Sequence, residues 1–358
     1  MEEEIQKAET GARKAWPVVM SWVGGITALI GLFVSLRGGI TWYQNNQKQK
    51  AELQAKMSLA QAQSRQAEYQ ASIQSYADIL KAGPLYRPAL DQQLDTAMLW
   101  LENFDVVSRA DEDAGQAAAA ALDQIMPVLD SGLTRSHGSQ AADVQAHIGW
   151  AHWLNKRIAE REAGDIDEQN LRAALKLDPP NVYANAMLGA WMLQTGGSLT
   201  DAVQHFNTAV ATGKVRPFVR KLQVGGLLNL DKKGARGELV KAANDMRKSS
   251  ETLDEEYKSR VLTFCFDPFG PVHAELVESL SAVPPEDAWN TYLWLDDNPE
   301  NAEAHRPAHE FIKANLLELS GKREESLAQY RVLQKEVKDR SFTMKIAIDA
   351  AIARLSHS

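Results

Sequence analysis

The sequence predicts an all-α protein that consists of a single N-terminal transmembrane helix, a helical stalk and an irregular α-solenoid. Two observations support this fold class. No residue from Val18 to Leu36 carries a charge. Beyond residue 69, helix-length segments are separated by Gly, Pro and Asn, and no strand-like alternation is sustained. The expected segments are an N-terminal flank (1–15), the transmembrane helix (16–43), the stalk (44–82), the helical repeat domain (83–340) and a C-terminal capping helix (341–358).

The uncharged run is interpreted as a membrane anchor. As a helix it would span roughly 28 Å, the thickness of a bilayer core. Trp22 and Trp42 lie near its two ends, where amphipathic rings favour the headgroup layer. A cleaved signal peptide is the main alternative, but its apolar core would be shorter and would end in a small-x-small site. We therefore expect a retained single-pass anchor in the cell membrane.

The orientation of the anchor is poorly determined by charge. Lys and Arg residues are balanced on its two sides, so the positive-inside rule gives no direction. The acidic start MEEE favours a soluble domain that faces the cytoplasm.

Small residues follow one stripe of the predicted membrane helix in alternating steps of three and four positions. Close backbone approach through small residues is the usual source of helix association in lipid. We expect this stripe to pack against another membrane helix, from a second copy or from a partner. Its members are Ser21, Gly24, Ala28, Gly31, Ser35 and Gly38.

The segment after the membrane is expected to be a solvated helical stalk. It contains neither proline nor glycine before Gly83 and is rich in Gln, Ala, Lys and Glu. Leu53, Met57 and Leu59 do not keep a heptad, so a continuous coiled coil is not expected.

The stretch LRAALKLDPPNVYANAMLGAWMLQTGGSLTDAVQHFNTAV (171–210) resembles the tetratricopeptide repeat, a helix-turn-helix unit of about 34 residues. Small residues stand where two helices of a unit would cross, and larger ones fill the space between them. The matching residues are Ala174, Leu177, Asp178, Pro179, Ala184, Leu188, Gly189, Ala202, Phe206 and Ala209.

Other units match the pattern less closely. The clearest repeats lie within 145–215, and Ile148-Gly149 precedes Leu188-Gly189 by forty positions, which predicts an insertion. Further junctions are expected around Pro84 and within 298–305, and residues 321–333 resemble the second helix of a unit. Residues 255–297 depart most from the pattern.

No constellation of residues predicts catalysis, a metal site or a cofactor, so we expect a protein that is not an enzyme. His305 and His309 are four positions apart, but Pro307 between them favours a solvated helix start over a metal pair. The single cysteine, Cys265, argues against a disulfide framework or a CxxC site. It is interpreted as a small buried hydrophobic residue. An undetected catalytic domain in 230–297 is a minor alternative.

The resemblance implies a concave groove that binds a peptide or helix segment of another protein. Some members of this family hold a terminal carboxylate with Lys, Arg and Asn side chains. The candidates here are Asn155, Asn185, Arg220 and Lys221, which do not reproduce the full pattern. The formal net charge of −8 argues against a nucleic-acid partner.

Together these features predict a membrane-anchored scaffold or adaptor. Its partners would be a protein segment in the groove, membrane lipid, and a transmembrane helix of itself or of a partner subunit. The alternative is an oligomeric membrane effector or pore-forming device that is regulated by the repeat domain. A pore wall would need a polar stripe, which Ser21, Thr27 and Ser35 do not form.

Overall fold

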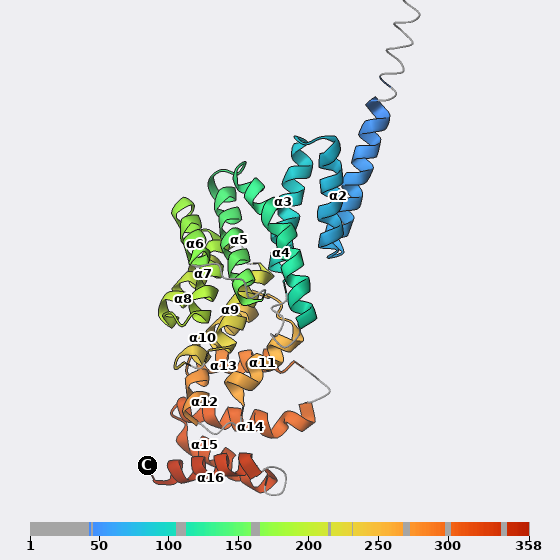
Figure 1. Ribbon diagram of the computed structural model, residues 1–358. Coiled ribbons are helices and arrows are strands. Elements are labelled where there is room, and N and C mark those ends of the chain that lie inside the picture. The colour runs from blue at the N-terminus through green and yellow to red at the C-terminus, as the bar shows by residue number, and fades with distance from the viewer. Residues whose placement is uncertain are drawn as a thin grey trace, which may run out of the picture. The chain divides into compact units, whose positions relative to one another are not determined.

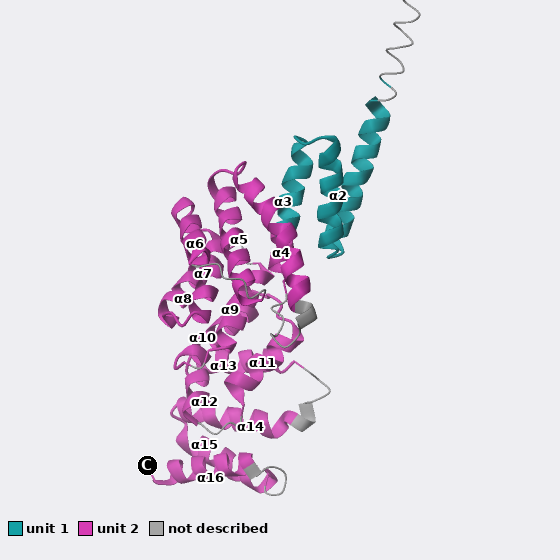
Figure 2. Cartoon of the chain, viewed as in Figure 1, with its two compact units in different colours: residues 1–97 teal, residues 98–358 magenta. Residues whose placement is uncertain are grey.

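The computed structural model describes residue 43 and residues 46–104, 112–158, 165–213, 216–230, 232–267, 273–297, 302–337 and 342–357. Within these ranges every regular element is a helix, which confirms the prediction of an all-α chain (Figure 1). The chain forms two compact units, residues 1–97 and 98–358, and the division falls within α3 (Arg87–Glu102) (Figure 2).

In unit 1 the segment expected as a stalk is a helical hairpin. One helix covers 46–65, Ala67 takes a positive φ of 61°, and α2 (Tyr69–Ala82) runs back along the first helix (Figure 1). The Ser72 hydroxyl donates to the Ala60 carbonyl at 2.8 Å, and Tyr76 is fully buried. The structure therefore differs from a solvated stalk, because this segment buries Met57, Ala60, Tyr76 and Ile79 in a core that also includes Ala89 of α3.

In unit 2 the helices follow one another with short connections. Their bounds are α4 Glu112–Leu133, α5 Gly138–Arg157, α6 Ile166–Leu177, α7 Val182–Gln194, α8 Leu199–Ala211, α9 Pro217–Leu228, α10 Ala235–Lys248, α11 Glu255–Phe266, α12 His273–Leu280, α13 Pro285–Leu295, α14 Ala302–Leu319, α15 Arg323–Val337 and α16 Phe342–His357.

These helices pack in pairs, and the pairs pack on one another (Figure 1). Helix α5 packs on α6, α7 on α8, α9 on α10 and α14 on α15. The first helices of neighbouring pairs are also in contact, α5 with α7, α7 with α9 and α9 with α11. This arrangement is consistent with a helical solenoid. Helix α16 packs on α15 at the end of the chain.

Small residues allow the helices of a pair to approach closely. A Cβ atom at Gly149 would lie 2.9 Å from the Asp167 carbonyl oxygen, and one at Gly189 would lie 3.0 Å from the Ala202 carbonyl oxygen. Such distances are shorter than ordinary van der Waals contacts, so only glycine fits without a shift of the backbone. The close approach brings Phe206 into full burial between α7 and α8.

Turn chemistry fixes where α7 and α8 begin. Asn181 precedes α7 and accepts a hydrogen bond from the Ala184 amide at 2.9 Å, and Ser198 accepts one from the Asp201 amide. Gly196, between the two helices, has a φ of 84°, which a side chain would disfavour. The predicted helix-turn-helix within 171–210 is thus present as α6, α7 and α8.

An equivalent hydrogen bond occurs at two distant places in the chain. The Ser72 hydroxyl donates to the Ala60 carbonyl, and the Ser326 hydroxyl donates to the Ala314 carbonyl, each across twelve positions at 2.8 Å. Tyr76 and Tyr330 follow these serines by four positions and are fully buried. The helical hairpin of 46–82 and the hairpin of α14 and α15 therefore make the same contact where their two helices cross.

Among the helices of the described residues, none is both long enough and apolar enough to cross a membrane. The predicted flank (1–15) and membrane helix (16–43) lie outside the described residues, apart from Tyr43. The same holds for the predicted membrane-packing residues Ser21, Gly24, Ala28, Gly31, Ser35 and Gly38.

Candidate binding groove

A groove in unit 2 is formed mainly by the first helices of successive pairs. It encloses about 830 Å³ and is lined by residues of α5, α7, α9 and α11, with Glu102 and Phe104 at one end. We call this feature the α5–α11 groove. A volume of this size accommodates several side chains of a bound segment.

The floor of the α5–α11 groove is aromatic. The indole rings of Trp150 and Trp153, one helical turn apart on α5, stack at 4.4 Å between centroids with an interplanar angle of 18°. Phe218 of α9 meets Trp150 edge-on at 6.3 Å. These rings are buried and packed on one another, so they form a rigid apolar surface at the base of the groove.

Charged side chains surround this floor. The Arg157 guanidinium lies 5.3 Å from the Trp153 ring, and that of Arg260 lies 5.6 Å from the Tyr257 ring. Both contacts are of the cation–π type. Burial raises the pKa of Tyr257, against the opposing effect of the nearby Lys221. The groove therefore offers cations beside aromatic faces.

Carboxylates are also present, and the structure gives them partners. Asp254 accepts a hydrogen bond from the Tyr257 amide at 2.8 Å and so caps α11. Glu256 lies 3.8 Å from Arg260. These carboxylates offset part of the positive charge, so the rim of the groove carries charged groups of both signs.

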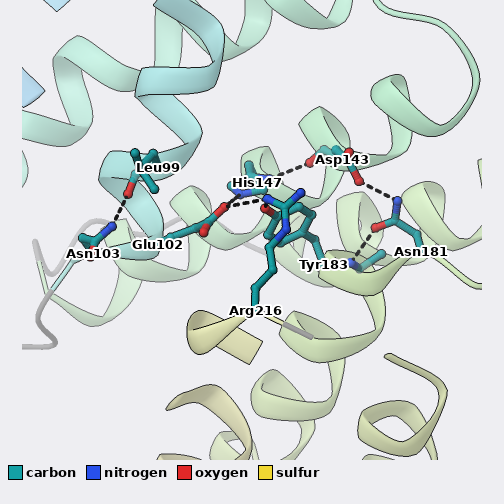
Figure 3. Close-up of polar contacts among 9 residues, drawn as sticks. Leu99, Glu102, Asn103, Asp143, His147, Asn181, Tyr183 and Arg216 are labelled. Atoms are coloured by element: carbon teal, nitrogen blue, oxygen red, sulfur yellow. Dashed lines mark hydrogen bonds and ion pairs between the residues drawn. The ribbon is translucent and has the colours of Figure 1, made fainter. Parts of the chain in front are cut away.

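A polar network surrounds Glu102, one of the residues that line the groove (Figure 3). His147 of α5 is fully buried, and its Nδ1 lies 2.7 Å from the Asp143 carbonyl oxygen. Its Nε2 lies 3.5 Å from Glu102 Oε1, outside hydrogen-bond geometry. Arg216, just before α9, lies 4.0 Å from the same carboxylate.

The network also connects α5 to α7. The Asn181 amide donates to the Asp143 carboxylate at 2.7 Å, and burial raises the pKa of this carboxyl although the Asn181 hydrogen bond lowers it. Arg216 hydrogen-bonds to the Tyr183 hydroxyl and lies 4.8 Å above its ring. Together these contacts position the helices that line the groove.

Two of the residues predicted to bind a peptide are committed to internal contacts. Asn185 is 3% exposed, donates to the carbonyls of Pro179 and Asn181, and contacts His205 Nδ1 at 2.8 Å. Arg220 is also 3% exposed and makes a bidentate ion pair with Glu251, with both N–O distances at 2.8 Å. Both side chains hold the solenoid together.

The structure places the other two predicted residues differently. Lys221 lines the α5–α11 groove. Asn155 is half-buried on α5, and its Oδ1 has no hydrogen-bond partner among the described residues. Trp150 and Trp153 are not among the binding candidates predicted from the sequence, and the structure places both in the lining of the groove. Aromatic residues one turn apart on the first helix of a repeat were the available signal.

A second cavity, of about 410 Å³, lies among α11, α12, α14 and α16. Cys265 lines it, and burial raises the pKa of its thiol to about 12. The thiol is therefore protonated at neutral pH and is a poor nucleophile or metal ligand. This result agrees with the interpretation of Cys265 as a buried hydrophobic residue.

Comparison with known proteins yields no relative from which a role could be transferred, because neither a protein-family model nor a curated protein sequence matches this chain.

Proposed function

We propose that this protein is a membrane-anchored scaffold or adaptor with repeats of the tetratricopeptide type. Its α5–α11 groove would bind a segment of a partner protein, and its N-terminal span would associate with other membrane helices. The groove is the observation that carries the proposal, because stacked first helices place an aromatic floor and charged side chains in one concave surface.

Internal spacing supports the repeat assignment. Gly189 on α7 faces Ala202 and Phe206 on α8, the positions that the repeat pattern gives to small and aromatic residues. The Ser72–Ala60 and Ser326–Ala314 contacts repeat this crossing, with Tyr76 and Tyr330 at the aromatic position. The same contact between small residues of two crossing helices, followed by a buried aromatic ring, therefore occurs in unit 1 and in unit 2.

The lining predicts what kind of segment would bind. Trp150, Trp153 and Phe218 favour an apolar or aromatic side chain on the floor. Lys221 and Arg260 at the rim favour an acidic or carboxyl-terminal group beside it. A short peptide with one apolar anchor and one carboxylate fits both requirements.

Site-specific photo-cross-linking in native membranes tests the groove. A photoreactive residue in place of Leu222, which lines the groove, is expected to capture one defined partner. The same residue in place of Asn207, exposed on the second helix α8, is the matched control and should not capture it. Equal capture at both positions would argue against a binding groove.

Charge reversal supplies an independent check. Lys221→Glu combined with Arg260→Glu should weaken partner binding by about 1–2 kcal/mol, roughly tenfold in the dissociation constant. Lys176→Glu, on the exposed face of α6, should leave binding unchanged. Unaltered binding of the double variant, with the fold intact by circular dichroism, would contradict the proposed role of the rim.

A further inference from the structure

A cluster of potential metal ligands lies at the junction of α13 and α14, apart from the α5–α11 groove. Asp296 follows the last residue of α13, and His305 and His309 lie on successive turns of α14. His305 Nδ1 lies 2.8 Å from Asp296 Oδ1, and His309 Nε2 lies 2.6 Å from Asp296 Oδ2. One carboxylate therefore faces two imidazoles from a neighbouring helix.

The separation of these atoms suits a coordinated ion. One nitrogen from each histidine and one carboxylate oxygen all lie within 4.8 Å of one another. A tetrahedral ion with bonds of 2.0–2.2 Å requires ligand atoms about 3–3.5 Å apart. The three side chains would need to move only by about the difference between these two distances to bring their ligand atoms to this spacing.

The environment of Asp296 favours a positive charge. Its side chain is 4% exposed, and its ion pairs are with His305 and His309, which are charged only when protonated. A buried carboxylate requires a cation or several donors to offset its desolvation. A divalent ion between the three side chains would supply this charge and leave both imidazoles neutral.

Aromatic residues shield one side of the cluster. The rings of Trp289 and Tyr292 meet His309 edge-on, with centroids at 6.2 and 5.4 Å. These rings restrict water around His309 and limit its motion, and both effects preorganise a metal ligand.

We propose that Asp296, His305 and His309 bind a divalent transition-metal ion of the zinc class. Imidazole nitrogens select such ions over calcium or magnesium, which prefer all-oxygen sites. Three protein ligands leave at least one coordination position for water or for a side chain of a bound protein. The ion would connect the end of α13 to the first turns of α14 and so stabilise this part of unit 2.

Metal titration of the full chain, purified without a histidine tag and stripped with chelator, tests the site. Zn²⁺ is expected to bind with a stoichiometry of about one ion per chain and to raise the thermal unfolding midpoint. Co²⁺ should give visible d–d absorption and quench Trp289 fluorescence, a signal that Trp289→Phe removes. His305→Ala and His309→Ala should each weaken binding at least about tenfold.

Matched controls separate this site from adventitious binding. Asp296→Asn should weaken binding, whereas Asp297→Asn, at the exposed neighbour, should not. His137→Ala removes an exposed histidine just before α5 and should bind as the unmodified chain does. The absence of saturable binding would overturn the proposal. Equal affinity of the His305→Ala, His309→Ala and unmodified proteins for Zn²⁺ would also overturn it. Neither result would affect the proposed function of the α5–α11 groove.

Discussion

At the scale of single residues, buried charge in unit 2 is held by specific partners. The Arg220 guanidinium uses Nε and Nη2 for Glu251 and Nη1 for the Gln223 side chain, at 2.8 to 2.9 Å. The pair links α9 to the residue stretch that follows α10. A side chain committed in this way stabilises the fold, whereas its neighbour Lys221 lines the groove.

Arg220→Met should destabilise the protein by about 2–4 kcal/mol, because Glu251 would lose its partner in a partly buried site. Arg220→Met combined with Glu251→Leu should recover most of this loss, since neither charge then remains. Arg172→Met, which removes an exposed pair with Glu168, should cost at most about 1 kcal/mol. Urea unfolding measures all three free energies, and equal costs for Arg220→Met and Arg172→Met would contradict the assignment.

At the scale of elements, the separation of paired helices depends on residues without a side chain. Gly149 lets α5 approach the α6 backbone, where a Cβ would also lie 3.0 Å from Leu171 Cγ. Gly115 in α4 is different, because the atom nearest to an added Cβ there is 3.6 Å away. The same substitution should therefore have opposite signs at the two positions.

Gly149→Ala should destabilise unit 2 by about 1–3 kcal/mol, since the helices must move apart. Gly115→Ala should stabilise it by about 0.5–1 kcal/mol, because alanine restricts the unfolded chain and favours the helix. Thermal or urea unfolding of both variants checks the difference. Stabilisation by Gly149→Ala would show that the α5–α6 crossing is looser than the structure indicates.

At the scale of the whole molecule, the predicted membrane helix would attach the two described units to a bilayer. If the interpretation of 16–43 is right, the full chain should remain with membranes after alkaline extraction. A chain of residues 46–358 should be released, because it lacks the predicted membrane helix. Sedimentation followed by immunoblotting measures the distribution, and release of the full chain would rule out a transmembrane anchor.

The small-residue stripe predicts a second behaviour of the full chain. Gly24→Leu, Gly31→Leu and Gly38→Leu together should keep the protein in the membrane, since the helix becomes more apolar. They should also disrupt its association with another membrane helix, because leucine prevents close backbone approach. Cross-linking in membranes measures this loss, and an intact complex would contradict the interface.

Part of the structure follows directly from the sequence. The punctuation of helix-length segments by Gly, Pro and Asn predicts an all-α chain, and the junction from Leu171 to Val210 predicts α6, α7 and α8. Both rest on local chemistry, such as the caps at Asn181 and Ser198 and the positive φ of Gly196. Local rules act between residues near in sequence, so a single sequence reveals them.

Tertiary contacts decided the rest. Sparse apolar residues made the predicted stalk (44–82) look solvated, yet Ala60 and Ser72 lie at a helix crossing where packing requires small side chains. The groove brings together residues from Glu102 to Arg260, and the proposed metal ligands join Asp296 to a histidine pair on the next helix. How far a side chain is exposed, which side chain it contacts and which distant residues share a site all depend on how helices far apart in the sequence pack. Arg220 and Lys221 are adjacent and both basic, yet Arg220 is buried in the core and Lys221 lines the groove.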